Sequence, residues 1–117
     1  MPQTPPRSAE PALAAIRAAG GDELVHAMLA AFSGFANAQW AWLETQAAAN
    51  AHEAVSIAAR ALRTSAQQVG AVEIADACEA AELAAASRDG AAVSAALHEV
   101  AHGIAAARPW MDAPGAP

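Results

Sequence analysis

Two short stretches of the sequence combine residue types that could do chemistry. His98-Glu99-x-x-His102 matches the H-E-x-x-H string, in which two histidines one helical turn apart hold Zn²⁺ and the glutamate activates a water molecule. A second stretch carries Arg60 and Arg63 among hydroxyl and amide side chains. The first pattern is typical of a zinc hydrolase. The second is a polar strip that carries two guanidinium groups.

The second stretch, which we name the arginine strip, runs along one face of a helix predicted over residues 50–70. Its polar side chains recur at steps of four, three and four residues, opposite an apolar stripe of valine, alanine and leucine. Such a pattern indicates a solvent-exposed helix face, which can remain merely solvated or can bind a partner. The strip comprises Ser56, Ile57, Arg60, Arg63, Thr64 and Gln67.

The composition indicates how the chain positions these stretches. It contains 39 alanines against 25 larger apolar residues, and it contains no tyrosine. Because alanine favours helices and buries little area, we predict closely packed helices around a thin core. Residues that start or end helices predict a short helix at residues 12–19. They predict longer helices at 22–49, 50–70, 71–88 and 91–107. Asp22 and Asn50 are the expected N-caps of the first two long helices.

Short links between long helices predict antiparallel neighbours, hence an all-α, up-and-down four-helix bundle with a short additional N-terminal helix. We expect residues 12–110 to form this bundle, between a flexible proline-rich arm at 1–11 and a flexible tail at 111–117. Three predicted core stripes are Val55, Ala59, Leu62, Ala66 and Val69; Ile74, Cys78, Ala81 and Ala85; and Val93, Leu97, Val100 and Ile104.

The stretch from Leu24 to Leu43 lacks charged residues over a length that could span a bilayer. Helical phase nevertheless predicts an amphipathic helix with a polar side at His26, Ser33 and Asn37. Its apolar side is predicted at Leu24, Met28, Phe32, Phe35, Trp42 and Leu43. We therefore expect no membrane association. The three tryptophans are expected to be packing or lid residues rather than a ligand cage. Trp40, at the edge of the apolar side, could contribute to a docking surface.

Charge and cysteine content narrow the function further. Six arginines, no lysine and twelve carboxylates give a net charge of −6, which disfavours nucleic acid and anionic membranes as partners. The single cysteine, Cys78, cannot form an internal disulfide, and prolines interrupt the N-terminal stretch where a secretory signal would need apolar residues. These features favour a cytoplasmic protein.

The segment Ala58–Ala71 resembles the signature of bacterial histidine-phosphotransfer (HPt) domains, roughly A-H-x-L-K-G-S-A followed by three residues and G-A. The likeness extends over about residues 12–108. Asp22-Glu23-Leu24 begins where the family's long second helix begins, and Ile74, Cys78 and Glu82 fall where the family places leucine, cysteine or alanine, and glutamate. The resemblance implies a four-helix bundle with a short additional N-terminal helix.

Three departures from this signature determine what the resemblance implies for activity. Arg60 occupies the position of the phosphoacceptor histidine, Arg63 that of a lysine and Thr64 that of a glycine. A phosphorelay needs a neutral imidazole nitrogen that attacks an aspartyl phosphate, and guanidinium cannot replace it. The resemblance therefore implies a pseudo-HPt protein, without catalytic residues or cofactor, whose arginine strip binds a response-regulator receiver domain or a histidine kinase. In this reading Arg60 points at the receiver's carboxylate cluster.

The H-E-x-x-H string is not expected to form a metal site. The predicted core stripe of its helix places His98 and His102 roughly 140° to 180° away from the core, so both should face water. The alternatives to the pseudo-HPt interpretation are an authentic phosphotransfer protein that uses another histidine, such as His52, a generic helical adaptor or dimer, and a zinc hydrolase.

Overall fold

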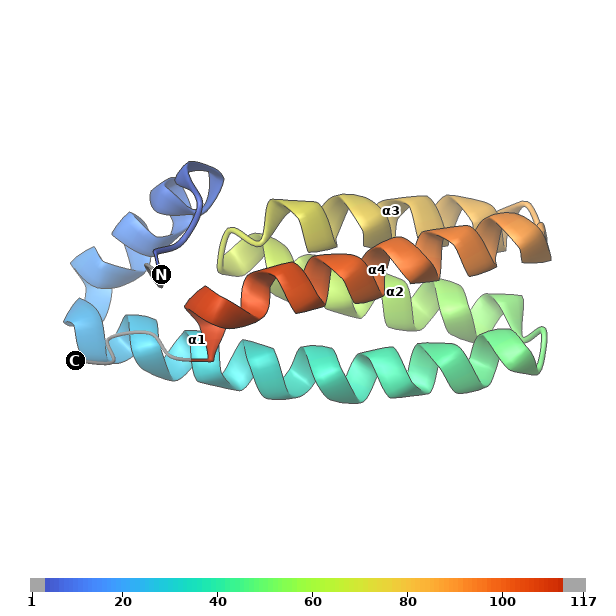
Figure 1. Ribbon diagram of the computed structural model, residues 1–117, viewed down its shortest axis with the longest axis horizontal. Coiled ribbons are helices and arrows are strands. Elements are labelled where there is room, and N and C mark those ends of the chain that lie inside the picture. Colours follow the sequence, from blue (N-terminus) through green and yellow to red (C-terminus); the bar gives the residue numbers. More distant parts are fainter. Residues whose placement is uncertain (1–3, 113–117) are drawn as a thin grey trace.

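The computed structural model describes residues 4–112, and over these residues the chain is an all-α four-helix bundle without strands (Figure 1). A 3-10 turn, η1, covers Arg7–Ala9. The four helices are α1 (Glu10–Ala48), α2 (His52–Gln68), α3 (Val72–Ala86) and α4 (Gly90–Met111). Short turns connect antiparallel neighbours, as predicted, and α1 packs against both α2 and α4.

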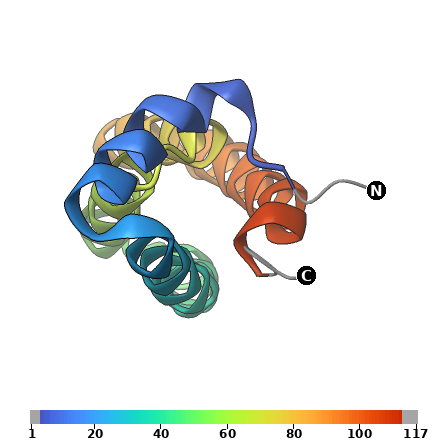
Figure 2. The same ribbon diagram turned by 90° about the vertical axis from the view of Figure 1, so that its left-hand side faces the viewer.

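The predicted additional N-terminal helix forms the first part of α1. A kink at Gly21, where φ is 73° and ψ is −170°, separates it from the rest of α1. Figure 2 shows this part lying across one end of the bundle. Asp22, the predicted N-cap, accepts a hydrogen bond from Arg17 Nε at 2.9 Å. Helical structure thus begins at Glu10, before the predicted boundary at residue 12, and the preceding Ala9 lies in the core.

The core stripes predicted for α2, α3 and α4 are confirmed, since all of their residues are buried. The stripe predicted for α1 is partly wrong. Ser33 is buried and its hydroxyl donates a hydrogen bond to Asp112 at the end of α4, whereas Phe35 and Trp42 are exposed. Because Asp112 accepts the hydrogen bond of the Ser33 hydroxyl, this small polar residue can be buried while the two aromatic rings face outward. The core side of α1 comprises Leu13, Ile16, Val25, Leu29, Phe32, Ala36 and Leu43.

Two predicted helix ends also differ from the structure. Asn50 does not cap α2, whose N-cap is Ala51; its φ of 56° instead ends α1 in the left-handed conformation that asparagine tolerates. α4 continues through Pro109 to Met111, although its end was predicted at residue 107. Burial of Trp110 and Met111 stabilises this last turn, offsetting the hydrogen bond that proline cannot donate. Asp89 caps the start of α4 by accepting a hydrogen bond from Ala92 N at 3.1 Å.

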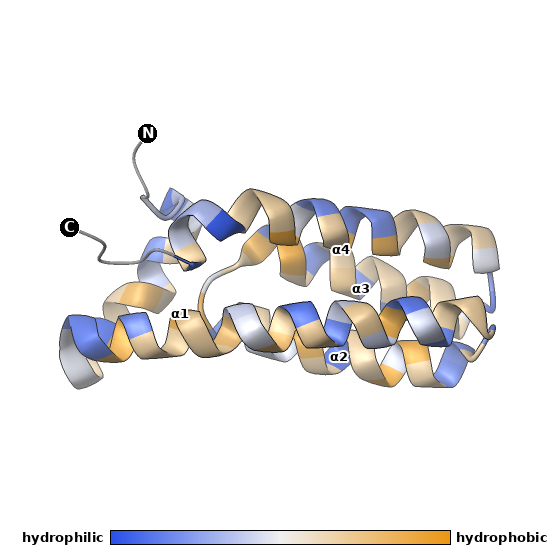
Figure 3. Ribbon diagram, turned by 60° about the horizontal axis from the view of Figure 1, so that its bottom comes forward, coloured by the Kyte–Doolittle hydropathy of each residue, from blue (hydrophilic) through white to orange (hydrophobic). Residues whose placement is uncertain are grey.

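Hydrophilic residues interrupt the apolar sequence along the helices (Figure 3). Within residues 4–112, every helix falls short of the uninterrupted apolar length that a membrane span requires.

Candidate functional site

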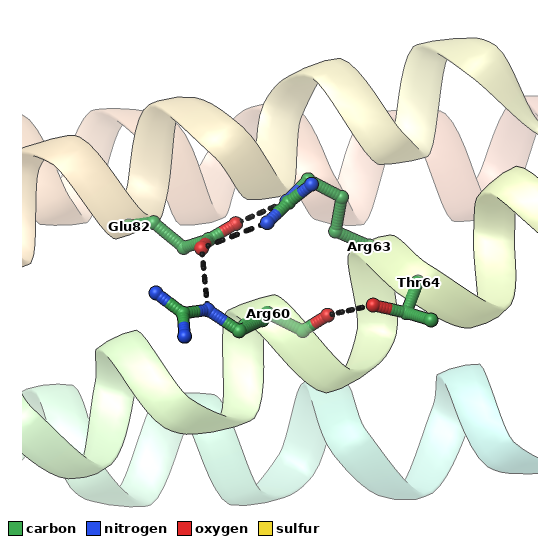
Figure 4. A network of polar contacts seen from close by, with 4 residues as sticks. All are labelled: Arg60, Arg63, Thr64 and Glu82. Carbon is green, nitrogen blue, oxygen red and sulfur yellow. Dashed lines mark hydrogen bonds and ion pairs between the residues drawn. The ribbon is translucent and has the colours of Figure 1, made fainter.

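The two arginines of the arginine strip meet a single carboxylate on the neighbouring helix (Figure 4). Arg60 Nε on α2 donates a hydrogen bond to Glu82 Oε1 on α3 at 3.3 Å. Arg63 donates two, from Nε to Oε2 at 2.5 Å and from Nη2 to Oε1 at 3.2 Å. This Arg–Glu cluster, comprising Arg60, Arg63 and Glu82, carries one net positive charge on a chain of net charge −6.

The two arginines occupy different positions in the cluster. The Arg63 side chain is 26% exposed, and its Nε and Nη2 both donate hydrogen bonds to Glu82. The Glu82 side chain is only 11% exposed. The Arg60 side chain is 71% exposed and uses only Nε. Its two terminal nitrogens are not joined to Glu82 (Figure 4). Arg63 therefore joins α2 to α3, whereas Arg60 presents donors at the surface.

The electrostatics of the cluster favour the ionised forms of Glu82 and Arg63. Partial burial alone would raise the pKa of Glu82, but hydrogen bonds from Arg63 and Arg60 outweigh it and lower that pKa below its usual value. The hydrogen bond to Glu82 likewise raises the pKa of Arg63. The cluster thus links α2 and α3 through a carboxylate that stays charged at neutral pH.

This linkage predicts a pH dependence of stability. Because the folded-state pKa of Glu82 lies below its unfolded value, its contribution is fully present above the unfolded pKa of about 4.3 and is lost as pH falls through the folded value. Glu82→Gln should lower the free energy of unfolding at pH 7 but have a smaller effect at pH 3. Urea unfolding at both pH values measures this difference. An equal loss at both would contradict the charge-based contribution, and Asp76→Asn, at an exposed position on the same helix, is the control.

An exposed apolar pair lies on α1 and α2, with its α2 member one turn before Arg60. Ile57 is 65% exposed and Trp42, on α1, is 52% exposed. The two side chains line a shallow hollow of about 290 Å³ between α1 and α2, which Ala61 and Gln39 also border. Gln39 Nε2 donates a hydrogen bond to the Ala58 carbonyl at 3.2 Å and closes the floor of this hollow. Trp42 was predicted to face the core, so its place beside the strip is a feature that helical phase did not identify.

The other residues of the arginine strip make one hydrogen bond to the Arg–Glu cluster, at a backbone carbonyl. Thr64 donates its hydroxyl hydrogen bond to the Arg60 carbonyl one turn earlier, at 3.0 Å. Ser56 is half-buried, and Gln67 is exposed near the end of α2. The structure therefore brings Arg60 and Arg63 together with Glu82 of α3, and it brings Ile57 together with Trp42 of α1.

The H-E-x-x-H string lies on the outer face of α4, where His98 and His102 are both exposed as predicted. Among residues 4–112, no three or more His, Cys, Asp or Glu side chains are grouped so as to hold a metal ion. Protein purified without added metal should contain well under one zinc per chain. Chelators should leave its helicity and melting temperature unchanged, because we expect no metal to stabilise the fold. Stoichiometric zinc whose removal lowers the melting temperature would contradict this prediction.

The other side chains that could react lie apart from the Arg–Glu cluster or are inaccessible. His26 and His52 are both half-buried, and His52 lies in the first turn of α2, two turns before Arg60. Cys78 is buried in the core, where burial raises the pKa of its thiol to about 12. The thiol is therefore neutral and unreactive at neutral pH.

None of the family models, curated proteins or solved structures compared with the chain matches it.

Proposed function

We propose that this chain is an HPt-like, non-phosphorylatable binding module of two-component signalling, acting in the cytoplasm on a receiver domain or on the histidine kinase that feeds it. The observation that carries the proposal is the exposure of Arg60 near the middle of the α2 face. Its side chain is 71% exposed, and Ile57, one turn earlier on α2, forms an exposed apolar pair with Trp42 of α1. A charged donor next to a small exposed apolar surface is the pattern of a protein-binding site.

The chemistry of the partner follows from the chemistry of Arg60. A receiver domain carries a cluster of carboxylates that otherwise holds Mg²⁺, and a guanidinium group offers two parallel donors that match a carboxylate. Arg63 already neutralises much of Glu82, so Arg60 can leave its single 3.3 Å hydrogen bond without leaving that carboxylate unpaired. Binding would hold an unphosphorylated receiver.

A titration tests this function directly. Fluorescently labelled receiver domains encoded near this chain's gene should bind it with an affinity that falls as Mg²⁺ or salt rises, because both compete with Arg60 for the carboxylates. Phosphorylation of the receiver should also weaken binding, since Mg²⁺ and the phosphoryl group then occupy the same pocket. Binding that is indifferent to Mg²⁺ and phosphorylation would leave a generic helical adaptor as the function.

A second experiment separates this proposal from authentic phosphotransfer. Incubation with a phosphorylated receiver or an autophosphorylating kinase should leave no acid-labile phosphate on the chain, because an arginine stands at the acceptor position. Autoradiography before and after acid treatment measures this directly. Label that disappears on His52→Gln would contradict the prediction and identify the acceptor. Arg60→His restores an imidazole at the matching position and is the positive variant.

A further inference from the structure

A hollow of about 410 Å³ lies between the C-terminal end of α1 and the N-terminal half of α4, at the end of the bundle where α1 turns into α2 (Figure 1). Small side chains create it, because Ala47 and Ala48 on α1 face Gly90 and Ser94 on α4. At the other end of the same helix pair, Arg108 Nη2 donates a hydrogen bond to Asn37 Oδ1 at 2.9 Å. The two helices are thus held together at one end and leave a space at the other.

The lining of this hollow has one formal charge, the carboxylate of Glu44. Neither arginine nor lysine lines it. Its polar neighbours are the side chains of Asn50, His52, Ser94 and His98, and its apolar walls are Trp40, Val93 and Leu97. The volume falls within the range of small-molecule sites, roughly 300 to 1,000 Å³, and such sites combine apolar walls with a few polar groups.

The helix ends around the hollow add to its preference for positive charge. The C-terminal end of α1, at Ala47 and Ala48, is the negative end of that helix dipole. The opposite pole, at the start of α4, is already neutralised by the Asp89 carboxylate that caps it. An anion would meet Glu44 and the negative end of α1, so electrostatics select a cation.

The apolar walls favour an organic cation over a bare metal ion, because Trp40, Val93 and Leu97 offer no ligand atoms but can pack against alkyl groups. We propose that this hollow binds a small substituted ammonium ion, with its charge near Glu44 and its methyl groups against Trp40. An ammonium group close to an indole ring and a carboxylate gains both cation–π and Coulomb attraction, and its alkyl groups fill the apolar part of the space. This proposal is independent of the Arg–Glu cluster, which lies on α2 and α3.

A matched pair of probes tests the charge requirement. Choline and 3,3-dimethylbutan-1-ol have nearly the same shape, but only choline is charged. In a titration followed by NMR of the indole N–H signals, choline should shift the Trp40 signal saturably and leave those of Trp42 and Trp110 unchanged. The neutral alcohol should bind roughly fivefold more weakly or worse. Equal binding of both probes, or no saturable shift of Trp40, would overturn the proposal.

Variants locate the site. Glu44→Gln should weaken choline binding roughly fivefold or more, whereas Glu99→Gln, at an exposed position outside the hollow, should leave it unchanged. Ser94→Leu should fill the space and abolish the Trp40 shift. Ser94 and both glutamates are exposed, so we expect all three variants to fold, which thermal melts followed by circular dichroism verify. Choline binding that survives both Glu44→Gln and Ser94→Leu would place the cation elsewhere and overturn the proposal.

Discussion

Arg60→Ala should weaken binding of the cognate receiver domain by roughly thirtyfold, which corresponds to about 2 kcal/mol. The size of the effect depends on desolvation. An arginine–carboxylate pair at the centre of an interface loses water on binding, and truncating one partner then leaves the other charge unpaired. A contact at a solvated rim would cost well under 1 kcal/mol.

Arg17→Ala is the matched control for charge. It also removes one positive charge from the chain, but Arg17 lies at the kink of α1 and pairs with Asp22. Its substitution should change receiver affinity less than about twofold at physiological salt, because exposed charges farther apart than a Debye length are screened. Equal losses in both variants would mean that the chain binds through its overall field and not through Arg60. Isothermal titration calorimetry against the same receiver measures both variants.

The Arg60→Ala protein should remain folded, which keeps the binding experiment interpretable. Arg63 retains both of its hydrogen bonds to Glu82 when Arg60 is truncated, so the buried carboxylate keeps its charge partner. Arg63→Ala is the less informative variant. It would remove the main partner of a nearly buried carboxylate and lower stability together with binding.

The sequence predicted the core stripes of α2, α3 and α4 well. Every residue of those stripes is buried, although Ile57 on α2 and Val72 and Leu83 on α3 are larger apolar residues that are exposed. On α1 the larger apolar residues occur on more than one side, with Phe35 and Trp42 on one arc and Leu29 and Ala36 on another. Periodicity could not decide between these arcs. The hydrogen bond from Ser33 to Asp112, 79 residues later, favours the second.

The candidate site was predictable only in part for the same reason. The spacing of Arg60 and Arg63 follows from one helix, but their shared partner lies on the next. Arg60 and Glu82 are about equally far along the chain from the turn at Gly70, so two antiparallel helices bring them to one level. This register was the signal available for Glu82 beyond the HPt resemblance. The exposure of Trp42 beside Ile57 depends on the phase of α1, which the sequence left undetermined.

Gly70→Ala should lower the free energy of unfolding by about 3 kcal/mol. Gly70 ends α2 with a φ of 75°, a left-handed conformation that costs an L-residue roughly 1 to 2 kcal/mol. A Cβ at this position would also lie 2.6 Å from Ala9 Cα and 2.9 Å from the Ala9 carbonyl oxygen. Both are backbone atoms of a residue in the core, so relief requires the first part of α1 to move away from the bundle.

Gly34→Ala is the control for this substitution. Gly34 lies inside α1 with open space around its Cα, so alanine should raise stability by roughly 0.5 to 1 kcal/mol through its higher helix propensity. Urea unfolding followed by circular dichroism measures both variants. Hydrogen exchange should show that Gly70→Ala accelerates exchange at Leu13 and Ile16, because these two residues are buried only while the N-terminal part of α1 lies across the end of the bundle. A Gly70→Ala protein as stable as the wild type, with Leu13 and Ile16 still protected, would mean that this part of α1 does not pack against Gly70.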